Sequence, residues 1–135
     1  GADYRLPLLF PRDWSGYGCG LSLGTVDPAL HARRVEAAEA GNHLVVDAFL
    51  ETPWSPAGDM ETAYHELIAG IRPGVTYLAF HPNAAGDIEV IDPPRWKSRI
   101  TEHRLFADPG FLAAIERAGL HLVGMRGIRE VLGRG

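Results

Sequence analysis

The 135-residue chain contains one cysteine, Cys19, so it can form neither an internal disulfide nor the paired CxxC clusters of a structural zinc site. No apolar run approaches the roughly 20 residues of a membrane helix, and the first residues lack a signal-peptide pattern. The net charge is −4 with both signs interspersed, which gives no electrostatic footprint for nucleic acid or an anionic membrane. We therefore expect a cytoplasmic protein with no nucleic-acid partner and no membrane partner.

Several common catalytic signatures are also missing. HExxH, GxSxG and GxxxxGK[ST] do not occur, which removes the usual zinc protease, serine hydrolase and P-loop interpretations. Glycines are frequent at residues 13–24, but they lack the GxGxxG spacing at a strand-to-helix turn that dinucleotide binding requires. His31, His65 and His121 have no second histidine at metal-ligand spacing, so we interpret them as structural or exposed.

The chain does contain enough apolar material, 46% of its residues, for a single globular α/β domain over residues 1–135. Short, β-rich and mostly continuous apolar runs are typical of strands buried on both faces of a parallel sheet. These runs predict strands at residues 6–10, 44–50, 75–80 and 120–125.

Helices are predicted between and after these strands. Asp27-Pro28, Asp59 and Asp108-Pro109 are cap signals, because an aspartate can cap a helix and proline suits its first position. The predicted helices are residues 29–40, 59–71, 94 or 95–106, 110–118 and 128–132. The alternation favours parallel β-strands joined by right-handed helical crossovers.

His81 stands where the third predicted strand ends. In a parallel sheet, the carboxyl ends of the strands form the ligand-binding edge, and an imidazole there could act as general acid or base or bind a metal. The alternative is a histidine that only caps the strand by hydrogen bonding. Asp47, in the second predicted strand, needs a partner if buried. It would orient His81 or help to hold a metal, or it would pair with a structural arginine.

Arg99 and Glu102 are three residues apart in the third predicted helix, so their side chains can lie on one face. They either frame the same site as His81 or form a surface salt bridge. Trp54 and Trp96 lie beyond the carboxyl ends of strands, where an aromatic face can stack on a sugar ring. The alternative for both tryptophans is partly buried packing.

The segment PGVTYLAFHPN at residues 73–83 resembles the P-G-V-T-E-h-h-x-H-P-G segment of the YdjC-like, chitooligosaccharide-type carbohydrate deacetylases. Arg99 and Glu102 then match the family's R-x-x-E, and Asp108-Pro109 its helix-opening D-P. Upstream, VVDAF at residues 45–49 is similar to a family strand with an aspartate near its end. The agreement covers residues 44–125.

The resemblance implies the second half of a (β/α) barrel-like hydrolase that removes N-acetyl groups from amino sugars or oligosaccharides. It also implies a divalent metal, zinc or magnesium, that polarises the acetyl carbonyl and activates water. His81 would be the catalytic histidine that protonates the departing amine. The substrate site would be framed by Asp47, Arg99, Glu102, Trp54 and Trp96.

The chain also departs from the family pattern. The family's metal-binding aspartate and histidines belong to an amino-terminal half, and no equivalent occurs before Leu44. We therefore expect a carboxy-terminal fragment that is inactive alone and binds no metal tightly by itself. Four strands are too few to close a barrel, so an open sheet edge predicts a homodimer. The alternative function is a non-catalytic saccharide-binding or dimerisation domain derived from the same fold.

Overall fold

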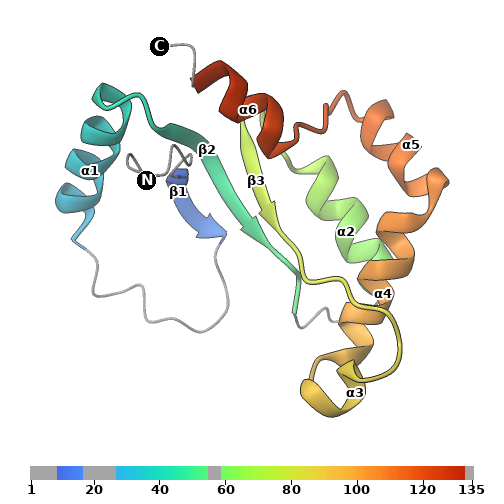
Figure 1. Ribbon diagram of the computed structural model, residues 1–135. Coiled ribbons are helices and arrows are strands. Elements are labelled where there is room, and N and C mark those ends of the chain that lie inside the picture. Colours follow the sequence, from blue (N-terminus) through green and yellow to red (C-terminus); the bar gives the residue numbers. More distant parts are fainter. Residues whose placement is uncertain (1–8, 17–26, 55–58, 133–135) are drawn as a thin grey trace. The chain divides into compact units, whose positions relative to one another are not determined.

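The computed structural model describes residues 9–16, 27–54 and 59–132 (Figure 1). Strands and helices alternate in the first part of these ranges and helices follow one another in the rest, so the protein is α/β. The elements are β1 (Leu9–Gly16), α1 (Pro28–Ala40), β2 (Leu44–Glu51), α2 (Met60–Ala69), β3 (Thr76–Ala79), α3 (Ile88–Ile91), α4 (Trp96–Ala107), α5 (Pro109–Arg117) and α6 (Met125–Leu132).

The strands form one sheet in the order β1-β2-β3, and β1 pairs with β2 in parallel. Between β2 and β3, the Asp47 N–H donates to the Val75 carbonyl at 2.7 Å, and the Thr52 N–H donates to the Ala79 carbonyl at 3.0 Å. Hydrogen-bonded partners that advance together along two strands define a parallel pair. The predicted α/β class and parallel sheet are confirmed, whereas barrel-like closure and pairing of a sheet edge with a second copy stay predictions.

The chain divides into two compact units, which we describe separately. The first comprises Gly1–Leu50, Gly74–Leu78 and Leu122–Gly135. In this unit α1 packs against β1, and its core side chains are Val35, Ala38 and Val46. Helix α1 begins as predicted, because Asp27 Oδ1 accepts a hydrogen bond from the Ala29 N–H at 2.9 Å and Pro28 occupies the first turn.

The second unit comprises Glu51–Pro73 and Ala79–His121. In it α4 packs against α2, α3 and α5. Three aromatic rings, Tyr64, Phe106 and Phe111, meet edge to face with centroids 5.2 to 6.4 Å apart, a geometry that their quadrupoles favour. The buried side chains of this core are Met60, Tyr64, Ile68, Ile88, Ile100, Leu105, Phe111 and Ile115.

The aspartate caps predicted for two helices of the second unit are confirmed. Asp59 Oδ2 accepts from the Thr62 N–H at 3.2 Å at the start of α2, and Asp108 Oδ1 accepts from the Gly110 N–H at 2.7 Å at the start of α5. Each carboxylate satisfies a backbone donor that has no partner within its own helix.

The strand predicted at residues 120–125 is wrong. Leu122 and Val123 are 74% and 68% exposed outside any strand, and α6 begins at Met125, three residues before the predicted helix. The backbone makes helix-end and turn hydrogen bonds here, from the Leu120 N–H to the Ile115 carbonyl and from the Ile128 N–H to the Gly124 carbonyl. A segment rich in strand-forming residues becomes a strand only where it can hydrogen-bond to a neighbouring strand. No described strand pairs with these residues.

The first strand also differs from its prediction. Strand β1 begins at Leu9 and continues through Gly16, into the glycine-rich segment at residues 13–24, because Asp13 lies opposite Ala48 in the ladder with β2. Pairing with β2 therefore keeps the start of that segment in a strand, despite its glycine at residue 16. Residues 6–8 of the predicted strand and residues 17–24 of the glycine-rich segment lie outside the described residues. The short helix α3 lies after His81, where no helix was predicted.

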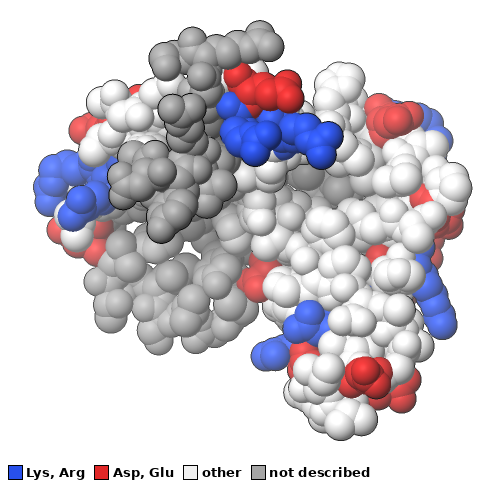
Figure 2. Space-filling view, viewed as in Figure 1, with Lys and Arg blue, Asp and Glu red and all other residues white. Residues whose placement is uncertain are grey.

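Charged side chains are spread over the surface in small groups. Figure 2 shows lysine and arginine beside aspartate and glutamate, and the described part of this face carries no broad area of one sign. No helix within the described ranges is long and apolar enough to cross a membrane.

Replacing Gly74 with alanine should destabilise the protein more than the same change at Gly86. Both glycines have strongly positive φ, +127° and +130°, so each alanine carries about 1–3 kcal/mol of backbone strain. Only at Gly74 would the new Cβ also overlap the Asp47 carboxylate, which accepts the Val75 N–H at 2.8 Å. Urea unfolding of Gly74→Ala and Gly86→Ala measures the difference, and equal losses would contradict the overlap.

Candidate functional site

Helix α4 holds His81 by its main chain. Glu102 Oε2 accepts a hydrogen bond from the His81 N–H at 2.8 Å, and Arg99 Nη1 donates to the His81 carbonyl at 3.3 Å. The Arg99 carbonyl also accepts the Asn83 N–H at 3.1 Å. The two helix residues therefore share one face, as their spacing predicts, and both bind the segment that follows β3. They do not pair with each other, because Arg99 instead forms an ion pair with Asp92 at 2.8 Å.

Glu102 is fully buried, although it was predicted to frame the substrate site. Its second oxygen, Oε1, accepts a hydrogen bond from the hydroxyl of Tyr64, which is also fully buried. A buried carboxylate is tolerated only when hydrogen bonds replace its water. Glu102 therefore acts on His81 from the core side, through the hydrogen bond to its main chain.

Tyr64 was not identified from the sequence as a partner of Glu102. The available signal was weak: a tyrosine on a core face needs an acceptor for its hydroxyl. Burial, and next the hydrogen bond and charge of Glu102, raise the pKa of the Tyr64 phenol far above its ordinary value. The Thr52 hydroxyl acts in the opposite direction by hydrogen bonding to the phenol. The phenol therefore keeps its proton at all physiological pH values.

The imidazole of His81 is positioned by Thr52 and Trp54. Its Nδ1 lies 3.0 Å from the Thr52 hydroxyl oxygen, and the ring lies 4.7 Å from the Trp54 ring at an angle of 43°. Thr52 was missed by sequence reasoning. It follows β2 as His81 follows β3, and adjacent parallel strands bring both to one edge of the sheet. The ring is half-buried, and no described side chain hydrogen-bonds to its Nε2.

Trp54 is enclosed by charged neighbours. Its indole N–H donates to Glu51 Oε1 at 3.0 Å, and the guanidinium carbons of Arg95 and Arg99 lie 5.2 and 5.4 Å from its ring centre. Cation–π contacts of this kind stabilise the ring where it is. A sugar ring could stack on the guanidinium-covered part of Trp54 only by displacing an arginine, so the packing role that we considered fits these contacts.

The remaining predicted residues, Asp47 and Trp96, make other contacts. Asp47 belongs to the first unit, where it accepts the Val75 N–H and lies 3.5 Å from Arg12 Nε, the arginine pairing that was its alternative role. Trp96 begins α4, and the ammonium nitrogen of Lys97 lies 5.4 Å from its ring centre. The structure thus brings together His81, Arg99, Glu102 and Trp54 of the predicted set, and adds Thr52, Tyr64 and Asp92 to them.

A divalent metal does not fit these residues by themselves. Within the described ranges no three histidine, cysteine, aspartate or glutamate side chains form a group that could hold a metal ion. A catalytic zinc site uses three protein ligands, whereas His81 already uses Nδ1 toward Thr52 and offers only Nε2.

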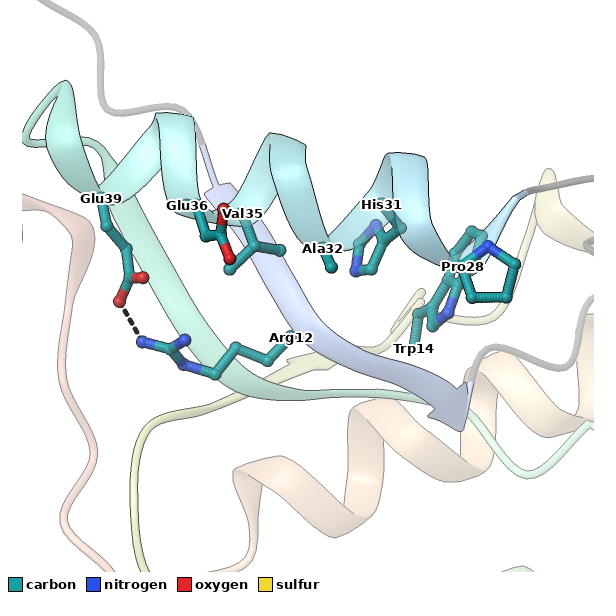
Figure 3. Close-up of a pocket in the computed structure, with 8 residues that line it drawn as sticks. All are labelled: Arg12, Trp14, Pro28, His31, Ala32, Val35, Glu36 and Glu39. Atoms are coloured by element: carbon teal, nitrogen blue, oxygen red, sulfur yellow. Dashed lines mark hydrogen bonds and ion pairs between the residues drawn. The ribbon is translucent and has the colours of Figure 1, made fainter.

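The first unit contains a cavity of about 450 Å³ between β1 and α1 (Figure 3). Arg12 and Trp14 are two residues apart in β1, so their side chains lie on the same side of the strand. There they face His31 and Glu39 of α1. Arg12 forms an ion pair with Glu39, and the Trp14 and His31 rings stack 4.8 Å apart and nearly parallel. The sequence did not predict this cavity, because it depends on packing one helix against one strand.

Comparisons of the chain with protein-family models, with curated proteins and with solved structures gave no match.

Replacing Glu102 with alanine should lower the free energy of unfolding by about 2–5 kcal/mol. The change leaves a cavity, and it removes the acceptor of both the His81 N–H and the Tyr64 hydroxyl. Glu102→Gln is the matched control. Its amide oxygen can still accept the His81 N–H, and its NH₂ can donate to the Tyr64 oxygen, so we expect a loss below about 1.5 kcal/mol. Urea unfolding at neutral pH measures both. Equal losses for the two variants would contradict the hydrogen-bonding role of Glu102.

The raised pKa of Tyr64 predicts a loss of stability in alkali. The folded protein keeps a proton that the unfolded chain releases above the ordinary tyrosine pKa of about 10. Unfolding free energy should therefore be independent of this group below about pH 10 and fall above it, by about 1.4 kcal/mol per pH unit.

In Tyr64→Phe the free energy of unfolding should no longer show this fall at alkaline pH. In Tyr77→Phe, a change at an exposed position, the fall should remain. Urea unfolding between about pH 9 and 11, across the ordinary pKa of tyrosine, gives the slopes. An unchanged slope in Tyr64→Phe would show that the phenol is not the group responsible.

Proposed function

We propose that the His81 cluster, defined as Thr52, Trp54, His81, Arg99 and Glu102, is the acid–base part of an amide hydrolase for N-acetylated amino sugars. One observation supports this most: the His81 ring is held at Nδ1 and through both main-chain groups, while Nε2 has no described partner. A held imidazole with one unengaged nitrogen is the arrangement required of a general acid or base near neutral pH.

In such a hydrolysis, water adds to the acetyl carbonyl carbon and the C–N bond breaks, giving acetate and a free amine. The departing nitrogen needs a proton, and the attacking water must lose one. His81 Nε2 can accept the proton of the water and deliver it to the nitrogen, so the ring returns to its initial state.

Two arginines supply hydrogen-bond donors beside this imidazole. Arg99 is committed to Asp92 and to the His81 carbonyl, so its role is to hold the site. Arg95, also over Trp54, has a half-exposed side chain and lies 3.8 Å from Asp92. Arg95 is therefore the guanidinium that a sugar hydroxyl or acetyl oxygen can reach. This distribution fits an oligosaccharide substrate better than an apolar one.

The cavity of the first unit favours a second candidate, a non-catalytic saccharide-binding domain. Its lining combines an aromatic ring, Trp14, with an arginine and two glutamates, Glu36 and Glu39. Aromatic faces with a few polar groups are common features of ligand pockets. An experiment can distinguish the two candidate sites, because each contains a different tryptophan, Trp54 in the His81 cluster and Trp14 in the cavity.

The indole N–H signals of the three tryptophans in a ¹H–¹⁵N spectrum test both candidates. On titration with N,N′-diacetylchitobiose, the proposed function predicts a shift of the Trp54 signal, assigned with Trp54→Phe, and loss of that shift in His81→Ala. Asn83→Ala, a change at an exposed neighbour, is the matched control. A shift of the Trp14 signal alone would favour the binding domain, and no shift at millimolar ligand would contradict both.

A further inference from the structure

The cavity between β1 and α1 of the first unit is lined by charges that do not balance. Two glutamates, Glu36 and Glu39, face it together with one arginine, Arg12. Arg12 is already engaged by carboxylates, because it forms an ion pair with Glu39 and its Nε lies 3.5 Å from Asp47 Oδ1. The Glu36 carboxylate forms no ion pair or hydrogen bond with any described residue. One negative charge at the cavity is therefore left for a positively charged ligand.

The rest of the lining suits a small body with apolar surface. The wall formed by α1 contributes the apolar side chains of Pro28, Ala32 and Val35. Figure 3 shows the stacked Trp14 and His31 rings toward one end of the cavity and the Arg12–Glu39 ion pair at the other, with Glu36 between them. The volume of about 450 Å³ is typical of small-molecule sites, which range from about 300 to 1,000 Å³.

We propose that this cavity binds a protonated amine carried on a body the size of a single six-membered ring. The ammonium group pairs with Glu36, and the ring packs on the apolar wall of α1. An anionic ligand is disfavoured, because the only cationic side chain in the lining, Arg12, is already paired. A polyamine fits less well than a single amine, because it needs several unpaired carboxylates and Glu36 is the only one in the lining.

This ligand class differs from those of both candidate functions. An N-acetylated amino sugar carries a neutral amide, and a plain saccharide carries hydroxyls alone, so neither compensates the charge of Glu36. The inference does not rest on the hydrolase proposed for the His81 cluster. It is also independent of the titration with N,N′-diacetylchitobiose, because that ligand has no ammonium group.

The test titrates the full chain at about pH 7, where carboxylates are ionised and amines are protonated, with two matched pairs of ligands. Glucosamine is compared with N-acetylglucosamine, and cyclohexylamine with cyclohexanol. The indole N–H signal of Trp14 in a ¹H–¹⁵N spectrum, assigned with Trp14→Phe, reports binding, and those of Trp54 and Trp96 are internal references.

The amine of at least one pair should shift the Trp14 signal with an affinity about fivefold or more above that of its neutral counterpart. The pair that shows this preference identifies the body of the ligand, hydroxylated for glucosamine and apolar for cyclohexylamine. Equal affinities within both pairs, or no Trp14 shift with either amine at millimolar concentration, would overturn the proposal.

Three variants at exposed positions, which leave the core intact, place the amine in the cavity. Glu36→Gln keeps the shape of the side chain and removes its charge, so the amine should bind about fivefold more weakly and lose its advantage over the neutral ligand. Glu66→Gln removes the same charge from α2 in the second unit and should change nothing. Ala32→Leu should fill the cavity and abolish binding. Unchanged amine binding in Glu36→Gln or in Ala32→Leu would overturn the proposal.

Discussion

The carboxylate of Glu102 has no contact with solvent, and burying such a charge is costly unless each oxygen receives a hydrogen bond. Both oxygens are satisfied, one by Tyr64 of α2 and one by the main chain of His81 after β3. One side chain of α4 therefore connects a second helix and the end of a strand. The position of His81 is a consequence of that requirement, since moving the histidine would leave Oε2 without a donor.

Arg99 complements Glu102 on the solvent side of the same helix face. Its guanidinium pairs with Asp92, donates to the His81 carbonyl and lies over Trp54, so three different neighbours share one planar group. A lysine at this position would supply one point charge and could not reproduce the planar stacking and the forked donors together. The pair at positions 99 and 102 thus fixes His81 from two directions, with charge assistance in each hydrogen bond.

The parts of this site that were predictable are those encoded by local spacing. The aspartate caps of α1, α2 and α5, the continuous strands, and the i, i+3 relation of Arg99 and Glu102 depend on residues close in sequence. Tyr64 and Thr52 were not predictable as partners, because their roles arise from packing α2 against α4 and β2 beside β3. The false strand at residues 120–125 has the same origin: its composition suits a sheet, but no described strand pairs with it.

His81 therefore has two chemically different sides. Toward the core, its N–H donates to Glu102 and its Nδ1 is hydrogen-bonded to Thr52, and both of these partners are buried. Away from the core, Nε2 lies in a half-buried ring beside Trp54 and the two arginines. A histidine needed only to end a strand would require one of these main-chain bonds. Under the proposed hydrolase function, the additional restraint on the ring would fix the direction in which it transfers a proton.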